Sequence, residues 1–178
     1  MLIQSNGGAD PNKKYSWARD LPFEVTSKVI EEFKSDYNIF HIKRDDQVGF
    51  HNTTPLTASL RQILAVSLLS KKRLVIDSFM QHALAALRMP SVACWIVNRP
   101  KVFGYGLHTH IMANPFTVKP ELRNSFLNKF NIGGDEIEFP YLNENQIFDV
   151  DLIIKSLKEE PKVEESEKPT DDGADNNK

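Results

Sequence analysis

The sequence has little of several features that would assign a function directly. It holds one cysteine, Cys94, among 178 residues, which excludes an internal disulfide and a cysteine-rich metal cluster. No apolar run approaches the roughly eighteen residues that a membrane-spanning helix needs, and the opening residues do not resemble a signal peptide. We therefore expect a cytoplasmic protein with at most peripheral membrane contact.

Three common catalytic or nucleotide-binding signatures are also missing. The chain lacks the glycine spacing of a dinucleotide fingerprint, the Gly-Lys-Ser/Thr ending of a P-loop and a Gly-x-Ser-x-Gly nucleophile elbow. His108 and His110 alternate as they would on one face of a strand, but no acidic or cysteine partner lies at ligand spacing. We therefore expect no metal site and no cofactor, and no carboxylate pair can be assigned to one site.

The small net charge of −2 is unevenly distributed. Residues 158–178 hold eight acidic residues and four lysines, so residues 1–157 carry about +2. This excess is too small for a nucleic-acid footprint, and we expect no nucleic-acid partner. Residues 158–178 are almost without apolar side chains, so burial cannot offset the entropy that folding would cost them. We predict one domain at 1–157, followed by a disordered acidic tail at 158–178.

Apolar strands alternate with amphipathic helices along the domain. Short apolar runs predict strands at Leu2–Gln4, Asn38–Ile42, Leu74–Ile76, Val92–Val97 and Leu107–Met112. Spacings of three and four residues predict helices at 23–36, 56–70, 79–89 and 147–157, with a short one near 121–129. The helix at 56–70 is expected to bury Leu60, Ile63, Leu64, Ser67 and Leu68. This alternation predicts a mainly parallel sheet covered on both faces, a Rossmann-like three-layer α/β/α sandwich.

The best-defined unit is the strand, turn and helix at residues 73–90. Asp77 and Ser78 directly follow the apolar strand, and Ser78 suits the N-cap of the helix. In a parallel sheet this turn lies at the carboxyl end of the strand, where such sheets bind ligands. The helix N-terminus favours phosphate there, and His82 lies one turn further on the same face. We predict a binding site at this turn, with a purely structural cap as the alternative.

A long polar loop follows the first predicted strand, between residues 6 and 22. Gly7 and Gly8 would let the backbone approach a phosphate closely, although most such pairs are only turns. Lys14 and Arg19 could offset the charge of a pyrophosphate. A solvated loop without a ligand is the alternative.

The segment Asp77–Leu87 reads Asp-Ser-Phe-Met-Gln-His-Ala-Leu-Ala-Ala-Leu. It resembles the D-[ST]-G-x-x-H-x-x-A-A-L pattern of the glycosyltransferase family 9 enzymes, the ADP-heptose:lipopolysaccharide heptosyltransferases and their relatives. Lys14-Tyr15-Ser16-Trp17 similarly resembles their basic-x-Trp element, whereas Phe79 stands where the family usually has glycine. The resemblance extends in layout over about residues 2–157. It implies the C-terminal, donor-binding half of a protein with two Rossmann-like domains.

The resemblance also implies a function and a set of site residues. The function is inverting transfer of a sugar from a nucleoside diphosphate to a glycan or lipopolysaccharide-type acceptor, with the nucleotide-sugar as donor substrate. The implied donor-binding residues are Gly7, Gly8, Lys14, Trp17, Arg19, Asp77, Ser78, Phe79 and His82.

In the family, the catalytic base and the acceptor site belong to an N-terminal domain, which this chain does not supply. We therefore expect a fragment of a longer enzyme, a half that works with an acceptor-binding domain or subunit, or a remnant that binds without catalysis. A non-catalytic nucleotide-binding or interaction module is the alternative of a different class. A nucleotide-sugar epimerase of similar architecture would also need a second domain.

Overall fold

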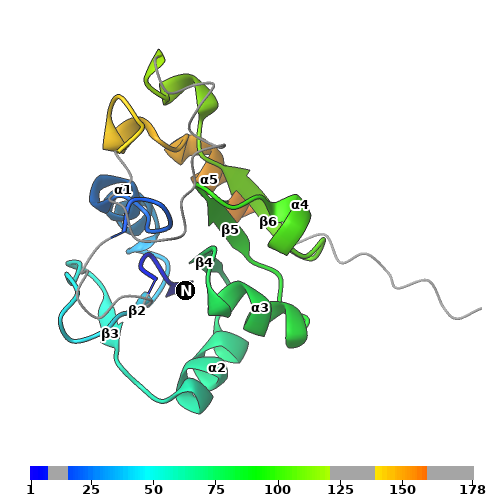
Figure 1. Ribbon diagram of the computed structural model, residues 1–178. Coiled ribbons are helices and arrows are strands. Elements are labelled where there is room, and N and C mark those ends of the chain that lie inside the picture. Colours follow the sequence, from blue (N-terminus) through cyan, green and yellow to red (C-terminus); the bar gives the residue numbers. More distant parts are fainter. Residues whose placement is uncertain (8–15, 121–138, 160–178) are drawn as a thin grey trace, which may run out of the picture.

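The computed structural model describes residues 1–7, 16–120 and 139–159. Its centre is a parallel sheet of six strands in the order β3-β2-β1-β4-β5-β6 (Figure 1). The strands are β1 (Leu2–Ile3), β2 (Phe40–Ile42), β3 (Thr54–Leu56), β4 (Arg73–Ile76), β5 (Val92–Trp95) and β6 (Thr109–Met112). The order reverses between β1 and β4, as in Rossmann folds. The predicted α/β fold class is therefore confirmed.

Helices cover both faces of this sheet and complete three layers (Figure 1). They are α1 (Phe23–Phe33), α2 (Leu60–Leu69), α3 (Phe79–Ala86), α4 (Pro100–Phe103) and α5 (Val150–Lys158), with 3-10 turns η1 (Pro115–Thr117) and η3 (Glu144–Gln146). One apolar cluster joins α1 and α5 to the sheet, and a second cluster joins α2 and α3 to its other face.

The strands bury their side chains on both faces. In β4, Leu74 and Ile76 belong to the cluster with α1 and α5, whereas Val75 belongs to the cluster with α2 and α3. All three are fully buried, as expected for a parallel strand between two helical layers. Cys94 in β5 is also buried, which raises the pKa of its thiol. A thiol with a raised pKa forms little thiolate, so Cys94 acts as a packing residue.

The outermost strand, β3, was not predicted from the sequence: Thr54 and Pro55 were assigned to no helix or strand, and Leu56 was expected to begin the helix at 56–70. Thr54 N donates to Ile39 O (2.8 Å) and Lys43 N donates to Leu56 O (3.5 Å). Pro55 lies between these two inward-bonded residues, so its nitrogen faces away from β2. A proline is tolerated at an outer strand for this reason. The short helix α4 (Pro100–Phe103) was not among the helices predicted from the sequence.

Helix α2 departs from the expected burial pattern. Ile63 and Ser67 are buried, but Leu60 and Leu68 remain 55% and 51% exposed. Only a narrow stripe of α2 therefore meets the sheet, and the prediction that Leu60 and Leu68 face inward was wrong. The helix also begins later than expected, because Ser59 is its N-cap residue.

Helix α5 ends at Lys158, close to the predicted domain boundary. Residues 160–178 of the predicted acidic tail, and the short helix expected near 121–129, lie outside the described residues. Within the described ranges, none of the helices has the length and apolar character required to cross a membrane.

Candidate functional site

Loops after β1, β2 and β4 come together at the carboxyl edge of the sheet, because β1 lies between the other two strands. A hollow of about 330 Å³ opens there. Its walls include Gln4 and Asn6 after β1, Lys43 after β2 and Phe79 at the start of α3. The hollow therefore lies beside the point where the strand order reverses, the usual ligand position in open α/β sheets.

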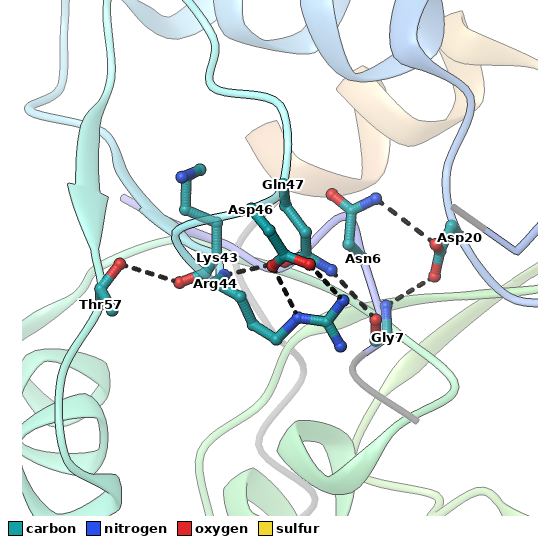
Figure 2. A network of polar contacts seen from close by, with 8 residues as sticks. All are labelled: Asn6, Gly7, Asp20, Lys43, Arg44, Asp46, Gln47 and Thr57. Atoms are coloured by element: carbon teal, nitrogen blue, oxygen red, sulfur yellow. Dashed lines mark hydrogen bonds and ion pairs between the residues drawn. The ribbon is translucent and has the colours of Figure 1, made fainter. Parts of the chain in front are cut away.

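The loop after β1 is held at both of its described ends by one carboxylate. Gly7 N donates to Asp20 Oδ1 (2.6 Å; Figure 2), and Ser16 N donates to Asp20 Oδ2 (2.8 Å). Burial raises the pKa of Asp20, while these two backbone donors act in the opposite direction. A Cβ atom at Gly7 would lie 2.9 Å from Arg19 Cδ. A side chain at position 7 would therefore require the Arg19 side chain to move.

The loop after β2 is tied to the loop after β1 by Gln47 (Figure 2). Gln47 Nε2 donates to Gly7 O (3.2 Å), and Gln47 Oε1 accepts from Arg44 N (2.9 Å). Arg44 forms a two-point ion pair with Asp46, at 3.0 and 3.1 Å. The described parts of both loops are thus held by polar contacts within the fold.

Lys43 is the cation of this loop that remains available to a ligand. It lines the hollow, and its ammonium group has no partner among the described residues. Lys43 was not among the site residues predicted from the sequence. It directly follows β2, just as Asp77 directly follows β4, so the strand-end argument applied to β4 would have found it.

The loop after β4 joins the site through Ser78. Met80 N donates to Ser78 Oγ (3.3 Å), which confirms the predicted N-cap, and Ser78 Oγ donates to Gln4 Oε1 (2.5 Å). Asp77 is buried and accepts a hydrogen bond from Asn98 Nδ2 (2.5 Å). The predicted residues Gly7, Asp77 and Ser78 are therefore brought to the same edge.

Phe79 is the first residue of α3 and forms part of the wall of the hollow. Its side chain is 47% exposed. An exposed aromatic ring beside a concave polar site can stack on a planar ligand group. The position of Phe79 is therefore compatible with contact to a bound molecule.

His82 lies one turn further along α3 and faces a different part of the molecule. Its Nδ1 atom lies 3.0 Å from the hydroxyl of Tyr105, on the connection between α4 and β6. The His82 ring is exposed and is not among the residues that line the hollow. His82 therefore does not line the hollow together with Lys43 and Phe79.

The other residues predicted to bind the donor in the loop at 6–22 do not all lie at the hollow. Arg19 lies beside Gly7, and its positive charge partly offsets the rise in the pKa of Asp20 that burial causes. The Trp17 ring packs edge-on against Phe139 (6.0 Å between centroids) and belongs to the core on the α1 and α5 face. Gly8 and Lys14 lie outside the described residues.

A buried histidine beneath the β1 loop orients two of its polar residues. His41 Nε2 lies 2.8 Å from Ser5 Oγ, while His41 Nδ1 has no partner within the described ranges. Nδ1 is therefore best assigned as the nitrogen without a proton, so Nε2 donates to Ser5 and Ser5 donates to Asn6 Oδ1 (2.8 Å). Burial, with a smaller contribution from Lys43, lowers the pKa of His41 to about 4. His41 is thus neutral at physiological pH and fixes Ser5 and Asn6 at the edge of the hollow.

The described histidines form no metal centre, since no three potential ligands gather in the part of the chain with described coordinates. His110 Nδ1 accepts from Trp95 Nε1 (3.0 Å), and His110 Nε2 donates to Tyr105 O (3.0 Å). His108 Nε2 donates to Gln81 O (2.9 Å). Burial lowers the pKa of both histidines. They therefore serve as neutral hydrogen-bonding groups that fix β6 and its preceding loop.

Comparison with known proteins gives a structural match. No family model and no curated protein matches the sequence. The fold is similar to a crystal structure of a glycosyl transferase family 9 protein from Veillonella parvula, with a TM-score of 0.53 and 16% sequence identity. The match covers 88% of this chain and 44% of that protein. The similarity supports the Rossmann-like fold, and the chain spans less than half the length of its structural neighbour.

Proposed function

We propose that this chain is the nucleotide-sugar-binding half of a glycosyltransferase resembling family 9. The observation that carries the proposal is the hollow at the carboxyl edge, where Lys43, Phe79 and the N-terminus of α3 surround one space. The similarity of the fold to a family 9 protein supports the same reading. The donor is a nucleoside diphosphate sugar, and the acceptor is a hydroxyl group of a glycan or lipopolysaccharide.

The diphosphate would lie between the loops after β1 and β4. N–H groups at the start of α3 suit phosphate oxygens, and the cations Lys43 and Arg19 would offset the charge of the diphosphate. Phe79 would pack against the ribose or the base. Asp77 and Ser78 hold the loops in place through Asn98 and Gln4.

In the reaction, an acceptor oxygen attacks the anomeric carbon while the bond from that carbon to the diphosphate oxygen breaks. The acceptor proton passes to a base from an acceptor-binding domain or subunit. This chain would stabilise the negative charge that develops on the leaving diphosphate. Electrostatic stabilisation by one preorganised donor contributes roughly 3–4 kcal/mol to lowering such a barrier.

Calorimetric titration with ADP, GDP and UDP tests the donor site. We expect at least one of them to bind, and Lys43→Gln to weaken that binding roughly tenfold through loss of a charge-assisted contact. Lys101→Gln is the matched control, because it removes the same charge from exposed α4. Absence of binding at millimolar nucleotide, or equal affinity in the Lys43 variant, would contradict the proposal.

A non-catalytic binding module is the second candidate, and the engagement of three carboxylates at this edge favours it, whereas the exposed Asp45 also lines the hollow. Among the described residues at this edge, Asp20, Asp46 and Asp77 all accept hydrogen bonds within the fold. None of these three is poised to take a proton from an acceptor. The test is an activity assay with nucleotide-sugars and an added acceptor-binding domain. Binding of the nucleotide-sugar without hydrolysis or transfer of the sugar would support this candidate over the first.

A further inference from the structure

A second hollow lies at the opposite, amino-terminal edge of the sheet, where β4, β5 and β6 begin. Its volume is about 350 Å³, which falls within the range of small-molecule sites. Lys71, Lys72 and Arg73 line it together with segments 90–92 and 106–109. The end of α5 closes its remaining side. No part of the proposed donor site reaches this edge.

Arg73 brings a buried positive charge to this hollow, with only 6% of the residue exposed. Its Nε donates to Ser67 O (2.9 Å) and its Nη1 donates to Pro90 O (3.2 Å), both uncharged acceptors. Among the described residues, no carboxylate pairs with the guanidinium group and Nη2 has no partner. Burial lowers the pKa of Arg73. A buried cation without a counter-charge is costly, so an anion that joined it would gain free energy.

Two lysines add to this positive charge. Lys72 Nζ donates to the carbonyl oxygens of Lys158 and Glu159, both at 3.3 Å, and so is engaged with the end of α5. Lys71 is exposed and has no side-chain partner within the described ranges. Glu159 is the one carboxylate among the lining residues that the structure describes. The hollow therefore carries three cations against one anion.

We propose that this hollow is a second binding site and that its ligand is an organic phosphate. A phosphate monoester carries close to two negative charges at neutral pH, which matches the excess positive charge of the lining. Because Nε and Nη1 of Arg73 are engaged, Nη2 is the nitrogen that remains to donate a charge-assisted hydrogen bond to a phosphate oxygen. Pro90, Val92 and Leu107 supply an apolar wall for the organic part. This site is independent of the proposed glycosyl transfer.

The test is titration of phenyl phosphate into the full 178-residue chain at low salt, followed by amide chemical shifts. We expect saturable shifts at Val92 and Thr109, because both residues line the hollow. Lys71→Gln should weaken binding about threefold to tenfold. Arg73→Lys keeps the charge but loses the planar fork, and should weaken binding about tenfold. Lys101→Gln removes one charge elsewhere and should leave the affinity unchanged.

The control ligands separate the parts of the proposal. Benzyl alcohol has a similar ring without the charge. If it binds with the same affinity as phenyl phosphate, the hollow recognises only the apolar ring and the proposed phosphate site is wrong. Equal affinity for inorganic phosphate and phenyl phosphate would contradict the proposal that the apolar wall recognises the organic part of the ligand. Shifts confined to Gly7 and Ser78, or unchanged affinity in Lys71→Gln with a folded spectrum, would also contradict the proposal.

Discussion

Ser78 links the two strands that meet where the strand order reverses. Its hydroxyl oxygen accepts from Met80 N at the start of α3 while its hydroxyl group donates to Gln4 after β1. One small side chain therefore satisfies a helix N-terminus and fixes the edge of the hollow. The loss of its hydroxyl should affect stability whether or not a ligand binds there.

We predict that Ser78→Ala lowers the free energy of unfolding by about 1 kcal/mol, the usual cost of losing an N-cap side chain. Urea denaturation monitored by tryptophan fluorescence measures this change. Ser35→Ala is the matched control, because Ser35 is exposed and lies outside the helices and strands. Equal midpoints for the two variants would show that the cap contributes nothing.

For His82 we predict a separation between stability and binding. His82→Ala should change the melting temperature little, since the ring is exposed and its bond to Tyr105 is at the surface. If the ring turns toward a bound diphosphate, nucleotide affinity should fall about tenfold. Tyr105→Phe removes the same surface hydrogen bond but keeps the imidazole, and should bind nucleotide normally. Normal binding and a much lower melting temperature in His82→Ala would make it a structural residue.

The site residues show which features the sequence could predict. The cap at Ser78 was predictable, because a serine between an apolar strand and a helical pattern has one common role. The contact of His82 with Tyr105 and the packing of Trp17 against Phe139 were not predictable. Both depend on distant segments, which local spacing does not place. Lys43 was accessible to the same strand-end argument and was overlooked.

At the scale of elements, α2 shows how a helical pattern can overstate burial. Its leucines recur at helical spacing, yet Leu60 and Leu68 are about half exposed while Ile63 is 8% exposed. The amphipathic pattern predicted the helix correctly. It could not predict how wide a stripe the sheet would cover, because that depends on the position of the helix over neighbouring strands.

This difference within one helix gives a matched pair of variants. Leu68→Gln should change the free energy of unfolding by no more than about 0.5 kcal/mol, as expected at an exposed position. Ile63→Ala should cost roughly 2–4 kcal/mol, because it leaves a cavity in the cluster with α3 and the sheet. Chemical denaturation of both variants measures the two values. A large loss in Leu68→Gln would mean that another surface covers this side of α2.

At the scale of the whole molecule, the fold was more predictable than the site. Parallel topology and three layers follow from the alternation of apolar strands with helices, since connections of that kind are right-handed and place helices on both faces. The sixth strand could not be predicted in the same way. Strand β3 is extended because Thr54 and Leu56 form hydrogen bonds with Ile39 and Lys43. These partners lie more than ten residues away in the sequence, so local sequence patterns do not predict the pairing.

The buried histidines make the stability of the whole fold depend on pH. Burial lowers the pKa of His41 to about 4, and it also lowers the pKa values of His108 and His110. In the unfolded chain these groups titrate near about 6.5. Between those values the unfolded state binds more protons, so stability must fall as the pH is lowered from about 6.5 toward 4.

We therefore predict that the free energy of unfolding is highest above about pH 7 and declines on acidification, with His41 contributing on the order of 3 kcal/mol by pH 4. Urea denaturation between pH 4.5 and 7.5 measures this profile. His41→Gln should flatten it, because a neutral side chain replaces the one that titrates. His51→Gln is the control, since His51 is exposed. A flat profile in the unaltered protein would contradict the prediction.

The two borders of the sheet differ in their capacity to recruit another strand. At β3, the outward position is occupied by Pro55, which has no N–H to offer. At β6, Thr109 N and Ala113 N bond inward to Ser91 O and Trp95 O, so the N–H groups at positions 110 and 112 point outward. Growth by strand addition is thus blocked at one border and open at the other. Any aggregate that forms by edge-to-edge pairing of this sheet should grow from β6, and a proline at position 112 should suppress it.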